Sequence, residues 1–156
     1  MTTAQPSTDP TLLVERGVAR TLELARTWLA WDGRPRLSDD GDRLYTPNKV
    51  IRRYTDHLID HLAEIEALLA GAECEPDHWH ASLVTVASDW APFTEADLNE
   101  ASQRLRRLGR VYALRMGAAG PTAWDASRAP HWTLREIVEH VSAPWYAEQV
   151  GDLRAG

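Results

Sequence analysis

The sequence has little of several things that mark common classes of protein. Cysteine occurs once in the 156 residues, at Cys74, so the chain forms no internal disulfide, which fits a reducing compartment. There is no run of about 18 apolar residues that could span a bilayer. Residues 1–10 have neither the basic region nor the apolar run of a secretion signal. We therefore expect a cytoplasmic protein with no membrane partner.

Blocks of like charge are also missing. The net charge of -6 is spread along the chain, and basic residues form only short groups such as Arg52 and Arg53. A surface that binds nucleic acid normally gathers Lys and Arg on one face or in one stripe. We therefore expect no nucleic-acid partner.

Apolar residues, by contrast, make up 44% of the chain, enough for the core of one domain. They recur at the three- and four-residue steps of amphipathic helices. The predicted helices are 10–31, 47–70, 95–117 and 133–152. Gly17 should weaken the first by up to about 1 kcal/mol relative to Ala. The pattern predicts a flexible tail at 1–8 and one all-α domain at 9–153, folded as a four-helix up-down-up-down bundle.

The clearest helix, 47–70, also carries the first functional signal. Thr46 can cap its first turn, and Pro47 suits the first helical position. His57 and His61 are four residues apart, so both project from one side, along the edge of the apolar stripe. The carboxylates of this helix are interpreted as a solvated face: Asp56, Asp60 and Glu64. A metal site would need a third ligand besides the two histidines.

The helix at 133–152 offers that third ligand. Thr133 and Glu136 form a T-x-x-E capping box at its start, and His140 follows one turn later. Pro144 cannot donate a hydrogen bond to the carbonyl four residues back, so the helix should kink or restart there. The sequence thus predicts an irregular backbone beside His140.

Two further groups of candidate ligands lie in segments predicted as loops, 32–45 and 72–93. They are Asp39, Asp40 and Asp42 in the first, and Cys74, Asp77, His78 and His80 in the second. The aspartates lack the regular spacing and the terminal Glu of a calcium loop. The second group has no other Cys or His pair with the spacing of a structural zinc site, so a polar loop is favoured. Residues 82–87 contain enough β-branched residues for a short strand, but a single strand would have no partner, so the segment is predicted as loop.

Three segments resemble the DinB-like, or YfiT-like, superfamily of four-helix bundles. They are RRYTDHLIDHLAEIEALLAG at 52–71, ASDWAPFTEADLNEASQRLRRL at 87–108 and WTLREIVEHVSAPWYAEQV at 132–150. The last is similar to the W-[ST]-x-R-E-x-x-x-H-V segment of the superfamily. The resemblance covers roughly Leu12 to Leu153. As a pattern of helices and short motifs, it is more specific for fold than for activity.

The resemblance implies a divalent metal, nickel or zinc, on three histidines: one from the second helix and an H-x-x-x-H pair from the fourth. This chain departs from that pattern, because its pair, His57 and His61, is on the second helix and Pro144 stands four residues after His140. A rearranged triad of His57, His61 and His140 is still chemically sensible. Imidazole suits zinc and nickel, and an open fourth position would admit water or a thiolate. A metal-free bundle is the alternative.

Two classes of function follow. The resemblance implies an enzyme whose metal activates a low-molecular-weight thiol or water, as a thiol-dependent transferase or a hydrolase acting on a small molecule. The alternative is a metal-free, stress-associated and non-catalytic bundle that binds a small ligand or a second subunit in a homodimer. The metal content of the protein distinguishes these two classes.

Overall fold

The computed structural model describes residues 9–76 and 81–154, so the tail predicted at 1–8 lies outside the described residues. Most of the described chain is helical, which confirms the all-α class. The α-helices are α1 (Leu13–Ala25), α2 (Pro47–Ala70), α3 (Glu95–Ala119), α4 (Pro121–Asp125), α5 (Leu134–Ser142) and α6 (Trp145–Val150). No helix in these ranges has the length and apolar character needed to cross a bilayer.

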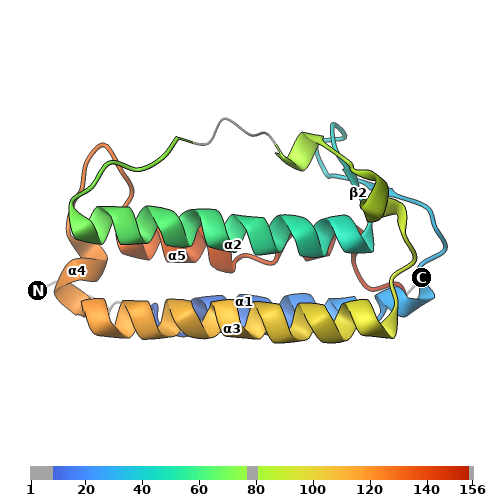
Figure 1. Ribbon diagram of the computed structural model, residues 1–156, viewed down its shortest axis with the longest axis horizontal. Helices are drawn as coiled ribbons and strands as arrows, with labels where there is room; N and C mark the ends of the chain where they lie inside the picture. The colour runs from blue at the N-terminus through green and yellow to red at the C-terminus, as the bar shows by residue number, and fades with distance from the viewer. Residues whose placement is uncertain (1–8, 77–80, 155–156) are drawn as a thin grey trace, which may run out of the picture.

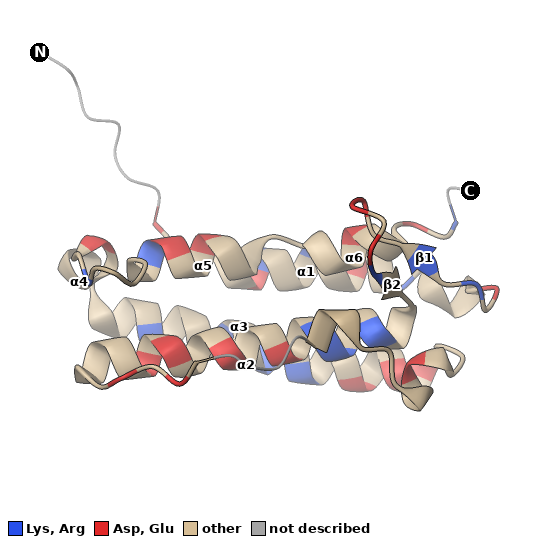
Figure 2. Ribbon diagram, turned by 90° about the horizontal axis from the view of Figure 1, so that it is seen from above, with Lys and Arg blue, Asp and Glu red and all other residues tan. Residues whose placement is uncertain are grey.

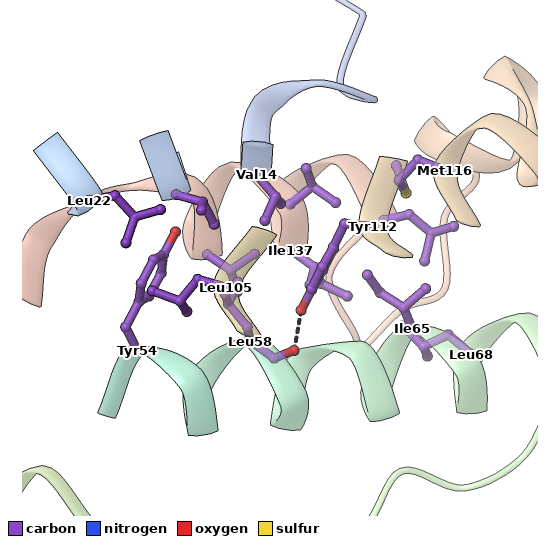
Figure 3. Close-up of a cluster of buried hydrophobic side chains, with 14 residues drawn as sticks. Val14, Leu22, Tyr54, Leu58, Ile65, Leu68, Leu105, Tyr112, Met116 and Ile137 are labelled. Atoms are coloured by element: carbon purple, nitrogen blue, oxygen red, sulfur yellow. Dashed lines mark hydrogen bonds between the residues drawn. The ribbon is translucent and has the colours of Figure 1, made fainter. Parts of the chain in front are cut away.

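The helices α1, α2, α3 and α5 lie lengthwise beside one another (Figures 1 and 2). α1 contacts α3 and α5, and α2 contacts α3, α5 and α6. Buried apolar side chains from all four long elements fill the space between them (Figure 3). The Tyr112 hydroxyl donates a hydrogen bond to the Leu58 carbonyl and so joins α3 to α2 within this core.

The second helix has the predicted ends. α2 begins at Pro47, the Thr46 hydroxyl accepts a hydrogen bond from the Lys49 amide at 3.2 Å, and Gly71 has the left-handed φ of 67° that ends the helix. α3 begins at Glu95 as predicted and extends to Ala119 rather than ending at residue 117.

The first helix is shorter than predicted at both ends. α1 begins at Leu13, and the Asp9 carboxylate accepts a hydrogen bond from the Thr11 amide at 2.9 Å instead of capping the helix. After Ala25 the chain turns into a 3-10 helix, η1 (Trp28–Ala30). The physical reason is a tertiary contact, because the Trp28 indole donates a hydrogen bond to the Gly151 carbonyl at 2.8 Å.

The predicted loops contain short regular elements. The loop at 32–45 holds an antiparallel pair of strands, β1 (Arg36–Leu37) and β2 (Leu44–Tyr45). In the described part of 72–93 there are two 3-10 helices and no strand; they are η2 (Ala81–Leu83) and η3 (Ala87–Trp90). The connection between α3 and α5 contains the short helix α4.

The predicted break in the last helix is confirmed. α5 ends at Ser142, α6 begins at Trp145, and Pro144 between them has φ -80° and ψ 37°, outside the helical range. The break re-aims the chain, so that the ring centroid of Tyr146 lies 5.5 Å from that of His57. The irregular backbone therefore brings an aromatic side chain to the histidines.

Candidate metal centre

The structure brings His57, His61 and His140 together. One ligand nitrogen from each ring lies within 4.8 Å of the other two. The ring centroids are 4.6 Å apart for His57 and His61, 4.8 Å for His57 and His140, and 5.0 Å for His61 and His140. Two residues from α2 and one from α5 thus face one point.

Core packing explains this convergence. Leu58 on α2 and Ile137 on α5 are fully buried, and α2 contacts α5 along the core. His57 is next to Leu58 in sequence, and His140 is one turn after Ile137, so each histidine lies at the edge of a buried stripe. When the two stripes pack together, the edges that carry the histidines meet.

Glu64 and Trp132 contact two of the three rings. The Glu64 carboxylate lies 2.7 Å from Nδ1 of His61, which leaves Nε2 of that ring available as a ligand. The Trp132 ring packs edge to face against His140, with centroids 5.1 Å apart. Glu64 was predicted to be a solvated carboxylate, and this interpretation is wrong. Its spacing of three residues from His61 is the signal that could have identified it.

Burial keeps the imidazoles of His57 and His140 neutral. It lowers the pKa of His57 to about 3, and nearby His61, His140 and Arg53 contribute in the same direction. Burial also lowers the pKa of His140; His61 adds to that shift and Glu64 opposes it. A metal binds neutral imidazole, so at neutral pH both rings are already in the form that can coordinate.

The lowered pKa of His57 predicts how the stability of the metal-free protein depends on pH. Between pH 6.5 and about 3, unfolded His57 takes up a proton that folded His57 does not. The contribution of His57 to the free energy of unfolding is therefore fully present above pH 6.5 and is lost as the pH falls. We expect a slope of about 1 kcal/mol per pH unit from this residue. Urea unfolding at about pH 7.5, 6 and 5 would measure it.

His57→Phe is the matched variant for that measurement, because it keeps a ring of similar shape and removes the titrating group. The variant should lose this part of the slope, while the carboxylates continue to titrate in both proteins. An identical slope in the wild type and in His57→Phe would contradict the prediction.

The donor set fits a small divalent cation. Zinc bonds to imidazole nitrogen are about 2.0–2.1 Å long, so ligand nitrogens in a tetrahedral site are about 3.3 Å apart. The observed separations, up to 4.8 Å, are longer than that, so the rings would have to turn toward one another to bind an ion. Three imidazole nitrogen donors and no thiolate suit zinc or nickel, and three protein ligands leave a coordination position open.

A pocket of about 460 Å³ opens beside His57 and His61. Its other lining residues are Arg43, Arg53, Asp60, Glu64, Cys74, Glu75, Ala81, Ser82, Leu83 and Tyr146. The sequence did not predict Arg53, Glu64 or Tyr146 as part of a site. A ligand in this pocket would lie next to the histidines.

The other candidate ligands do not join this centre in the described part of the chain. Cys74 lines the pocket, where burial raises the pKa of its thiol and Glu64 adds to the shift. Asp77, His78 and His80 lie outside the described residues. In the 32–45 connection, the carboxylate of Asp40 accepts a hydrogen bond from the Ser38 hydroxyl, and the Asp39 amide donates to Gln149 Oε1 at 3.0 Å.

Comparison of the sequence and structure with family models, curated proteins and solved structures gives no match. The chemistry of the site itself is therefore the basis for a function.

Proposed function

We propose that this chain is a DinB-like four-helix bundle that holds zinc or nickel on His57, His61 and His140 and acts as an enzyme on a small molecule. The observation that carries the proposal is the convergence of three imidazoles, each with a ligand nitrogen within 4.8 Å of the others, beside a pocket. Isolated histidines at a core edge would have no reason to meet at one point.

The reaction class follows from the open coordination position. A bound ion would act as a Lewis acid and lower the pKa of a thiol or water molecule, as a thiol-dependent transferase or a hydrolase requires. Protein side chains position the histidines that would hold the ion. Glu64 orients the His61 ring, and Tyr146 packs against His57 and limits its rotation. The pocket is large enough to hold a small substrate.

Elemental analysis tests the proposal most directly. Untagged protein, purified without chelator and then loaded with zinc or nickel, should hold about one equivalent of metal per chain. Less than about a tenth of an equivalent would refute the metal centre. That result would favour the metal-free bundle that binds a ligand in the same pocket.

The contact between Glu64 and His61 gives a second prediction. Glu64→Gln keeps the shape of the side chain and removes the charge that holds the Nδ1–H of His61. Zinc affinity should fall by about 10- to 100-fold, the usual effect of losing a carboxylate that orients a metal-bound histidine. Competition with a chromophoric chelator would measure the change.

The control is Glu66→Gln, on the same helix. Glu66 is exposed and pairs with Arg115 on α3 instead of with a histidine. It removes the same charge from α2, so a general electrostatic effect on zinc would appear in both variants. Equal losses in the two variants would contradict a specific role for Glu64.

A further inference from the structure

The end of the pocket away from Glu64 is built around two arginines. Arg53 lies one helical turn before His57 on α2, and only 7% of its surface is exposed. Arg43, which precedes β2, lines the same pocket. A guanidinium removed from water needs partners for its charge and its N–H groups. The partners of these two arginines therefore show how much of each guanidinium is left for a ligand.

The partners of Arg53 are incomplete among the described residues. Its Nε donates to the Ser82 hydroxyl at 3.2 Å, and its Nη1 donates to Asp56 at 3.4 Å, a long contact with a carboxylate that is 45% exposed. No described residue accepts a hydrogen bond from Nη2. The guanidinium also lies over the Tyr146 ring, 5.8 Å from its centroid. The side chain is thus held in place with donor capacity left over.

Arg43 provides the second guanidinium of this pocket. Its Nε is buried and forms an ion pair with Asp42 at 3.4 Å, and its guanidinium lies over the Trp145 ring, 6.0 Å from the centroid. The hydroxyl of Tyr45 is buried and lies close to the side chains of Arg43 and Ser82. The Arg43 side chain is about a third exposed, so part of its guanidinium is open to a ligand in the pocket.

The charges along the pocket are ordered. Arg53 comes four residues before His57, and Glu64 comes three residues after His61, so the histidines lie between a positive and a negative end of α2. With a rise of about 1.5 Å per residue, Arg53 and His57 are about 6 Å apart along the helix axis. Glu75 adds to the negative lining, beyond the end of α2.

We propose that the arginine end of this pocket binds an oxyanion group, a carboxylate or a phosphate, of a small molecule whose other end lies beside the histidines. The planar guanidinium of Arg53, fixed by Tyr146 and Ser82, presents N–H groups that match the paired oxygens of such a group. That the other end is the reacting end rests on the proposed function. Binding of the anion itself requires no metal.

The test uses the full chain treated with chelator, so that no metal can hold the anion. Butyrate, inorganic phosphate and the neutral analogue butyramide would be titrated separately, and the arginine Nε–H signals would be followed by NMR. Butyrate or phosphate should give saturable shifts and butyramide none. The anion that binds more tightly identifies the group that the subsite recognises.

Three variants locate the binding. Arg53→Gln and Arg43→Gln should each weaken binding by about tenfold or more, because each removes a charge-assisted hydrogen bond. Arg20→Gln is the matched control, since Arg20 is exposed on α1 and pairs with Glu23 outside this pocket. Thermal melting would show that each variant is folded. Arg43 is about a third exposed, so its variant keeps the test valid if Arg53→Gln unfolds.

The outcomes separate this inference from the metal proposal. Zinc-binding protein that shows no saturable anion binding overturns the inference and leaves the metal centre intact. So does zinc-binding protein whose Arg53→Gln and Arg43→Gln variants bind the anion as tightly as the wild type. Arginine-dependent binding by protein that takes up no zinc supports the anion subsite and refutes the metal-dependent function.

Discussion

Replacing His57 with alanine should weaken zinc binding by more than about 100-fold, because losing even an outer partner of a ligand costs about 10- to 100-fold. His57 is the central ring, with its centroid 4.6 Å from His61 and 4.8 Å from His140. Without it, two donors on different helices are too few to hold the ion. His140→Ala should have a similar effect, since it removes the donor from α5. Competitive titration with a chromophoric chelator measures both affinities.

The control for these variants is His131→Ala. His131 is exposed and lies in the connection before α5, outside the histidine cluster. His131→Ala removes an imidazole that could bind zinc nonspecifically at the surface. Its affinity should equal that of the wild type. Unchanged zinc binding in both His57→Ala and His140→Ala would refute the triad and favour the metal-free alternative.

Features determined by neighbouring residues were predicted well. Thr46 and Pro47 specify the start of α2 through a side-chain cap and a fixed φ, and both effects act within one turn. Pro144 breaks the last helix for the same kind of reason, because it lacks an N–H group. The pairing of His57 with His61 is also local, since it follows from the helical repeat.

Features determined by distant contacts were not predicted. The end of α1 depends on Trp28 and the Gly151 carbonyl, which are 123 residues apart in the chain. Arg53 belongs to a site because Ser82, from the connection after α2, lies against it. The periodicity of one helix identifies its apolar stripe and gives no information about which connection covers its polar edge. Site residues on that edge therefore look like surface residues in the sequence.

Gly17 has opposite effects on helix propensity and on the packing of α1. Helix propensity counts it as a cost of up to about 1 kcal/mol in α1 relative to Ala. In the structure it is buried where α1 meets the end of α5. A Cβ at this position would lie 2.9 Å from the Ser142 carbonyl carbon and closer still to its oxygen. The glycine therefore permits the approach of two backbones, two residues from His140.

Gly17→Ala should destabilise the protein by about 3 kcal/mol, the upper part of the range for overpacked cores, despite the better helix propensity of Ala. The reason is that the added methyl group meets backbone, which cannot rotate away as a side chain can. Urea unfolding measures the change in stability. Because the displaced segment is the end of α5, zinc affinity should fall as well, through movement of His140.

Gly117→Ala makes the same chemical change at a site without that constraint. Gly117 lies within α3, and a Cβ there would meet nothing within 4 Å. The substitution should therefore stabilise the protein by up to about 1 kcal/mol and leave zinc affinity unchanged. The opposite signs of the two changes would show that packing against α5, and not helix propensity, determines the residue at position 17. Stabilisation by Gly17→Ala would mean that α1 and α5 do not approach so closely, and the position of His140 relative to α2 would then have to differ as well.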